Sequence, residues 1–156
     1  VGSLLLLWSR VEKALTASIR TLHAGEVPKT AHGIGKSLNV WSTRVMRGHG
    51  GRQLQKQICK QLVKHLKEAL EIRNFVAHGL IGIAASFDRP GEADAHLTAE
   101  LNGEHRVFTR QELEEMFAWM SRAPELIACL ADAAMDHEPE SADRSLIPWK
   151  NFPVMA

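Results

Sequence analysis

Apolar residues recur at intervals of three and four over most of the chain, which is the period of an amphipathic helix. This pattern predicts helices in four segments: residues 2–25, 33–46, 52–78 and from 109 onward. Gly25 suits the C-terminal cap of the first helix. Thr109, with Glu112 three residues later, forms a capping box at the start of the last one. Pro124 should kink this last helix or split it in two.

The period changes in the segment that follows the third helix. Two stretches, "LIGIAASF" and "DAHLTAEL", flank a polar loop around "DRPGEA". Asn102-Gly103, a strong hairpin signal, then links "HLTAEL" to "EHRVF". We therefore expect a small antiparallel sheet of two or three strands. The predicted fold is mainly α: an up-and-down helical bundle of about four helices with a small antiparallel β-hairpin inserted before the last helix.

A chain of 156 residues fits one domain, and 45% hydrophobic residues are enough for a sizeable core. We assign residues 1–135 to a helical domain. Residues 136–156, polar and proline-bearing, are expected to form a C-terminal tail with Trp149 and Phe152 as docking anchors. The net charge of +1 argues against attraction of the whole molecule to nucleic acid, but it leaves room for a local basic face.

Cysteine and histidine usage gives no sign of a disulfide framework or a metal centre. Cys59 and Cys129 lie far apart in helix-like segments, so we expect two buried free thiols in a reducing compartment. The eight histidines lack the spacing of a metal-ligand pair with a carboxylate. The apolar run "LLLLW" is too short to span a membrane. We expect a cytoplasmic protein with no metal, no cofactor and no membrane contact.

Arg73 interrupts the apolar side of the long third helix. On a helical wheel it falls near the middle of an arc formed by Leu54, Ile58, Leu62, Leu66, Ala69, Leu70, Ile72, Val76 and Ala77. A guanidinium cannot be neutralised, so its unpaired burial is very costly. Arg73 would therefore snorkel past the edge of the bundle, pair with a buried acid such as Glu12, or hold a phosphate in a cleft.

His78 lies on another side of the same helix, about 140° from Arg73. Asn74 shares its side, and three lysines project along nearly the same strip: Lys56, Lys60 and Lys67. Such a ridge is often only a solvated face, and a lone histidine in the last turn favours the negative end of the helix dipole. A basic ridge that leads to a histidine also suits phosphodiester chemistry, which needs cations and a proton-transfer group.

The segment "RNFVAHG" resembles the signature of the HEPN superfamily. That signature has an arginine, usually followed by a polar residue, and then a histidine four to six positions further, near a helix end. Here these are Arg73, Asn74 and His78, the last after four intervening residues. The opening "LLLLWSRVEKAL" and the capped "FTRQEL" after a hairpin are similar to the family as well. The resemblance covers about residues 2–134 in outline.

The resemblance implies an all-α up-and-down bundle, often dimeric. Many active members are metal-independent endoribonucleases of toxin–antitoxin, abortive-infection and defence systems, whereas others are binding or scaffold domains. Carried over, Arg73 would hold the scissile phosphate, and His78 would exchange protons with the ribose 2′-OH or the leaving 5′-oxygen. Asn74 would orient His78 or contact the substrate. The lysine ridge would bind RNA, and the product would be a 2′,3′-cyclic phosphate.

The resemblance also implies partners. We expect a homodimer through the exposed side of the first or third helix, an RNA substrate, and an antitoxin or nucleotidyltransferase-like partner. The alternative is a non-catalytic helical module that binds a protein or a nucleotide. The offset between Arg73 and His78 fits a site completed across a dimer, and it equally fits a helix that unwinds at Gly79.

Two other signals carry little weight. "GIGKS" at residues 33–37 imitates the end of a P-loop, but it lacks the earlier glycine and the preceding strand, so a helix start is the better interpretation. The glycine-rich segment around His49 could line a nucleic-acid cleft, although such turns usually just connect helices.

Overall fold

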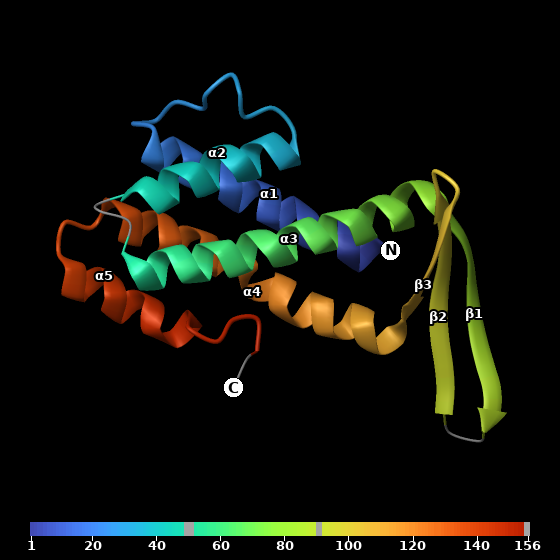
Figure 1. Ribbon diagram of the computed structural model, residues 1–156. Coiled ribbons are helices and arrows are strands. Elements are labelled where there is room, and N and C mark those ends of the chain that lie inside the picture. Colours follow the sequence, from blue (N-terminus) through green and yellow to red (C-terminus); the bar gives the residue numbers. More distant parts are fainter. Residues whose placement is uncertain (49–51, 90–91, 155–156) are drawn as a thin grey trace.

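The computed structural model describes residues 1–48, 52–89 and 92–154 (Figure 1). Its elements are helices α1 (Gly2–Leu22), α2 (Ile34–Arg47), α3 (Gln53–Gly79), α4 (Arg110–Met135) and α5 (Pro139–Leu146), the 3-10 helix η2 (Ile147–Trp149), and strands β1 (Leu80–Arg89), β2 (Glu92–Leu101) and β3 (Glu104–Thr109). The expectation of a mainly α fold with a small antiparallel sheet is confirmed, and the helix expected to be the last, α4, is followed by a further helix, α5.

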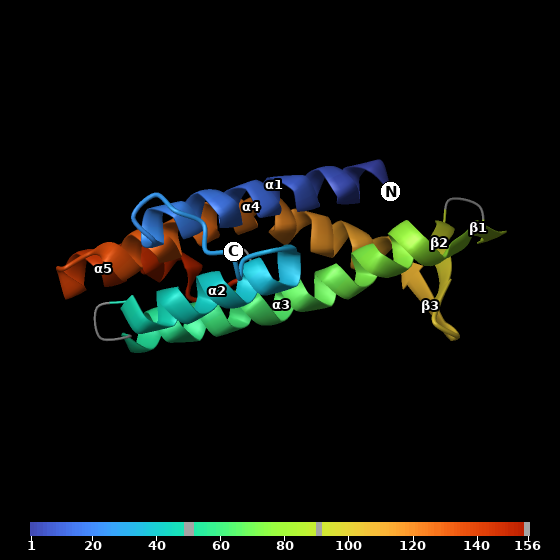
Figure 2. The same ribbon diagram turned by 90° about the horizontal axis from the view of Figure 1, so that it is seen from above.

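Four helices build the bundle. α1 packs against α4 and α2, and α3 packs against α2 and α4. Seen from above, α1 and α4 lie along one side of the molecule and α2 and α3 along the other (Figure 2). The apolar positions that predicted each helix meet between them, since Leu15, Trp41, Leu62 and Ile127 are all almost completely buried. The hydrophobic period of each helix thus produces the core directly.

The end of α1 follows the predicted cap. Gly25 has a positive φ of 94°, which glycine adopts without strain, and its N–H donates to the carbonyl oxygen of Arg20 at 2.7 Å. This bond satisfies a carbonyl of the last turn. The connection then turns back over the bundle to α2, whose first residue follows Gly33. The interpretation of "GIGKS" as a helix start is confirmed.

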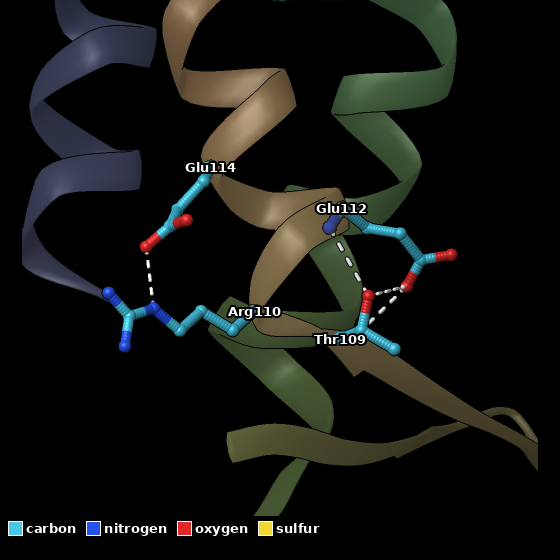
Figure 3. A network of polar contacts seen from close by, with 4 residues as sticks. All are labelled: Thr109, Arg110, Glu112 and Glu114. Carbon is cyan, nitrogen blue, oxygen red and sulfur yellow. Dashed lines mark hydrogen bonds and ion pairs between the residues drawn. The ribbon is translucent and has the colours of Figure 1, made fainter. Parts of the chain in front are cut away.

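The start of α4 carries the predicted capping box (Figure 3). The Glu112 N–H donates to Thr109 Oγ1 at 3.2 Å, and the Thr109 N–H donates to Glu112 Oε2 at 2.8 Å. The bond from the Thr109 N–H and a second bond, donated by the Thr109 hydroxyl to the same Oε2 at 2.9 Å, lower the pKa of the Glu112 carboxyl. The carboxylate therefore stabilises the fold above its ordinary pKa of about 4.3, and this contribution is lost as the pH falls through the lower folded pKa.

α4 runs through Pro124 without a break, so the expected split into two helices is wrong. Proline removes one backbone hydrogen bond inside a helix, but packing on the same helix offsets this loss. Met120, Ala123 and Leu126 around it are fully buried. These tertiary contacts lie on both sides of Pro124 and accompany the continuous helix.

The three strands form an antiparallel sheet in the order β1-β2-β3. Asn102 and Gly103 have φ values of 54° and 81°, and Leu101 pairs with Glu104 across them, so the predicted two-residue hairpin is confirmed. Ala99 and Phe108 are buried where the sheet meets α3 and α4. The rest of the β1–β2 hairpin extends away from the bundle (Figure 1).

The C-terminal segment is packed rather than trailing. It contains α5 and η2, and α5 contacts α4 and α3. Trp149 and Phe152 are buried, which confirms them as anchors. The Phe152 ring meets Trp119 of α4 edge-on, with centroids 6.0 Å apart. The sequence did not predict α5, because most positions of this helix are polar.

Within the described ranges, no helix combines the length and the apolar composition needed to cross a membrane.

The capping box gives a first testable prediction. Thr109→Ala removes the side chain that accepts from Glu112, and loss of an N-cap of this kind costs about 1 kcal/mol of unfolding free energy. Denaturant unfolding should show this decrease. Thr43→Ala is the matched control, because Thr43 is exposed inside α2, away from any helix start. Equal stability of the Thr109→Ala variant and the wild type would contradict a stabilising role for the cap.

Candidate functional site

Gly79 lies where the end of α3 meets the backbone of β2. It is buried, and a Cβ atom there would overlap the carbonyl group of Glu100 and press on the side chain of Leu101. Any other residue would push helix and strand apart. The absence of a side chain at Gly79 is therefore what lets the sheet pack against the last turn of α3, directly beside His78.

An aromatic pair reinforces this junction. Phe75 of α3 and Phe108 of β3 meet in a T-shape with centroids 6.1 Å apart. The guanidinium of Arg106 lies 5.2 Å from the centroid of each ring, and it is 3.8 Å from a carboxylate oxygen of Glu71. A cation–π contact at an exposed position contributes about 0.5–1 kcal/mol, and an exposed ion pair contributes about 0–1 kcal/mol. Sequence analysis missed Arg106, because no local pattern indicates that β3 reaches α3.

Arg73 lies on the packed strip of α3, one turn after Ala69 and one turn before Val76, both of which are buried. Its own side chain is only partly buried. Nη1 of Arg73 donates to Oδ1 of Asn74 at 3.1 Å. Glu12 is exposed, and no carboxylate in the described part of the chain pairs with Arg73, so of the alternatives left open by the sequence the pairing with a buried acid such as Glu12 is wrong. The observed side chain snorkels instead.

His78 is exposed in the last turn of α3. The helix continues through Gly79, so no unwinding turns His78 towards Arg73. At 100° per residue the two Cα positions stay about 140° apart. Among the described residues, the structure joins Asn74 to Arg73 by a hydrogen bond and records none between His78 and either of them.

The buried positions of the last two turns differ from the predicted arc. Ala77, expected on the apolar side, is exposed, and Phe75, which was not assigned to it, is buried. The cause is the sheet, which covers a second side of the helix at Phe75 while the bundle covers the side of Val76. Asn74 and His78 occupy the sides that neither surface covers, whereas Arg73 stays on the packed strip.

The lysine ridge follows the outer side of α3. Lys60 and Lys67 are exposed and Lys56 is partly buried. Lys64 is exposed on the same strip, one turn after Lys60, and helical spacing could have identified it. Further along the strip come Glu71 and then His78. The negative charge of Glu71 separates the lysines from the histidine, and its contact with Arg106 partly offsets that charge.

Neither cysteine is a candidate nucleophile. Burial raises the pKa of the Cys59 thiol to about 12. Partial burial raises the pKa of Cys129 as well, helped by the carboxylates of Glu125 and Asp132. The expectation of a buried thiol holds for Cys59, whereas Cys129 is only partly buried. Thiols with raised pKa values stay protonated near neutral pH and do not attack electrophiles efficiently.

No cluster of three or more histidine, cysteine or carboxylate side chains that could hold a metal ion occurs in the described residues. A cavity of about 280 Å³ lies at the sheet end of the bundle, and its lining includes Leu4, Val76, Leu97, Leu113 and Phe117. Arg73, Asn74 and His78 are not part of this largely apolar lining. The glycine-rich segment around His49 lies outside the described residues.

Comparison with known proteins gives no match to a family model, a curated protein or a solved structure.

Two glycines in helices provide a second prediction. Gly79→Ala should destabilise the fold by several kcal/mol and disturb the sheet, because the new methyl group overlaps the β2 backbone. Gly35→Ala in α2 is the matched control. Its Cβ meets no atom within 4 Å, so helix propensity alone should raise the unfolding free energy by up to about 1 kcal/mol. Thermal unfolding followed by circular dichroism measures both changes. A Gly79→Ala variant as stable as Gly35→Ala would contradict the proposed close packing.

Proposed function

We propose that this chain is a HEPN-like, metal-independent endoribonuclease in which Arg73 and His78 carry the reaction. One observation supports it above all. Arg73 lies at a core-facing position of α3 without a carboxylate partner among the described residues, and Asn74 and the exposed His78 follow it. A guanidinium that follows a packed strip and has no carboxylate partner keeps its charge available for an anion.

The proposed chemistry uses the ribose 2′-OH as nucleophile. His78 takes the proton of the 2′-OH or donates one to the leaving 5′-oxygen, and the 2′-oxygen attacks the adjacent phosphorus. The phosphorus–5′-oxygen bond breaks, which yields a 2′,3′-cyclic phosphate and a 5′-hydroxyl end. Arg73 neutralises the charge that develops on the phosphoryl oxygens. Asn74 holds the guanidinium, and Lys56, Lys60 and Lys67 contact the RNA backbone.

We further propose that the site is completed in a homodimer. Arg73 and His78 point to different sides of an unbroken helix, so a second copy of α3 supplies the missing group more readily than one copy alone. A cytoplasmic toxin or defence role, held in check by an antitoxin or a nucleotidyltransferase-like protein, fits a nuclease of this kind.

The rival proposal is a non-catalytic helical module that binds a protein or a nucleotide. The same offset favours it, because a single chain does not bring Arg73 and His78 together. On this proposal Arg73 is a snorkelling side chain that supports α3, and His78 is a solvated residue in the last turn.

Substitution separates the two proposals. Arg73→Ala and His78→Ala should each lower the rate of RNA cleavage by a hundredfold or more, because one removes charge stabilisation and the other proton transfer, each typically worth about 10²–10⁴ in rate. Labelled tRNA and mRNA incubated in EDTA give the measurement, and chelation should leave cleavage unchanged. Arg10→Ala and His32→Ala are matched controls, since both side chains are exposed and lie outside the motif.

A wild-type chain that cuts no RNA, together with a marked loss of thermal stability in Arg73→Ala, would favour the non-catalytic module. Loss of cleavage without loss of stability would favour the nuclease.

The dimer is testable by mixing the two inactive variants. In a site formed by Arg73 of one copy and His78 of the other, a mixed dimer contains one intact site. Statistical mixing makes half of the dimers mixed, so about a quarter of wild-type activity should return. Light scattering at tens of micromolar should show a dimer. A monomer at that concentration, or no recovered activity, would exclude the shared site.

A further inference from the structure

The charges of the chain are segregated along the sequence. Between residues 27 and 67, lysine and arginine occur nine times and aspartate and glutamate not at all, although the whole chain has 19 basic and 18 acidic residues. This acid-free segment supplies all of α2 and the first half of α3. Because α2 and α3 lie along the same side of the bundle, positive charge is concentrated there (Figure 2).

A groove lies between the end of α1 and α2, at one edge of this basic side. It has a volume of about 340 Å³ and is lined by His23, Asn39, Val40, Thr43, Arg44 and Arg47. None of these described lining residues is a carboxylate. Its polar side chains can donate hydrogen bonds through guanidinium, amide, hydroxyl and imidazole groups, which is the donor set that phosphate oxygens accept from.

The two arginines of the groove make no interaction with other described residues that would compete with a bound anion. Arg44 and Arg47 are exposed, and within the described residues neither makes a hydrogen bond or an ion pair. Nε2 of His23 is buried and lacks a hydrogen-bond partner there. Arg52, the next arginine along the chain, is committed: it donates to the carbonyl oxygens of Ala133 at 3.5 Å and Asp136 at 3.0 Å at the end of α4.

We propose that this groove binds a phosphate of the RNA backbone and anchors the RNA away from the end of α3. Arg44 and Arg47 hold the phosphate oxygens, and Asn39 and Thr43 add neutral hydrogen bonds. This inference deepens the proposed function and rests on RNA as the substrate.

The rest of the basic side favours a nucleic acid over a membrane or a protein partner. The large apolar side chains that are exposed in the described residues lie on α1, the sheet, the end of α4 and the connecting or C-terminal segments, and none lies on α2 or α3. A membrane-binding helix needs an apolar side, and a protein interface usually has an apolar centre. A surface of cations without apolar anchors suits a polymer of regularly spaced phosphates.

The groove is separate from the proposed cleavage site. Arg47 ends α2 beside the start of α3, whereas His78 is near the other end of α3 (Figure 1). A helix of 27 residues spans about 40 Å at 1.5 Å per residue. RNA anchored in the groove would therefore follow the lysines of α3 towards His78, and loss of the anchor would weaken binding without removing a reacting group.

Binding measurements test the groove apart from cleavage. The full chain carrying His78→Ala, so that RNA stays intact, is titrated into fluorescently labelled single-stranded RNA at several salt concentrations, with anisotropy as the readout. Adding Arg44→Ala and Arg47→Ala should weaken binding on the order of tenfold or more near 0.1 M salt. It should also lower the slope of log affinity against log salt by about 0.7, because the groove holds one phosphate and each phosphate contact on a single strand contributes about 0.7.

Arg10→Ala with Lys13→Ala is the matched control, since it removes the same charge from exposed positions of α1 outside the acid-free segment. This control should change affinity and slope far less. Arg44→Lys with Arg47→Lys keeps the charge and should keep most of the salt slope, which separates loss of contacts from loss of fold. Equal losses in the groove variant and the α1 control would overturn the proposal.

Two further arms identify the ligand. An acidic peptide and anionic lipid vesicles replace RNA, and stronger groove-dependent binding to either one would overturn the choice of RNA. The two proposals also fail separately. If RNA binding depends on the groove but the wild-type chain never cuts RNA, the groove proposal stands and the nuclease proposal is wrong. If cleavage and RNA binding are unchanged by substitution of Arg44 and Arg47, only the groove proposal is wrong.

Discussion

The contact between Gly79 and the backbone of β2 is the constraint on which the end of the molecule that carries the candidate site depends. It fixes where α3 stops, and it brings the sheet close enough for Phe108 to reach Phe75. The hairpin is inserted between two bundle helices, so its position also sets where α4 starts, directly after its N-cap Thr109. One position without a side chain therefore determines the geometry of helix end, sheet and following helix together.

This junction explains why the polar residues of α3 lie where they do. The bundle covers the side of Val76 and the sheet covers the side of Phe75, so the last two turns are packed on two sides. Asn74 and His78 remain on the open outer side. Arg73 is the exception, because it interrupts the line from Ala69 to Val76. Burial there requires the charged head to reach the surface, and the partly buried side chain shows this compromise.

Features set by local chemistry were predictable from the sequence, whereas features set by distant contacts were not. Helical periods, the Asn102-Gly103 turn and the Thr109 cap depend on residues a few positions apart, and all three are present. The burial of Phe75, the place of Arg106 over two rings and the packing of α5 depend on segments far apart in the chain. The continuity of α4 through Pro124 belongs with these, because packing overrides a local preference. For the candidate site, the order and sides of Arg73, Asn74 and His78 followed from helical spacing, but the partner of Arg73 did not.

Asn74, the hydrogen-bond partner of Arg73, affects the distance between the guanidinium of Arg73 and the imidazole of His78, the two proposed reacting groups. Lys60 and His78 differ by 18 residues, which is five helical turns, so they lie on the same side of α3, while Arg73 starts about 140° away. The angle between Cα positions is not the angle between head groups, because an arginine side chain is long enough to bend around the helix surface. The hydrogen bond from Arg73 to Asn74, which shares the side of His78, draws the guanidinium towards the ridge. Asn74 thus connects the packed side of α3 with its outer side. An RNA phosphate lying on the ridge would meet His78 directly and would meet Arg73 at the edge that Asn74 holds, or from a second copy facing the same edge.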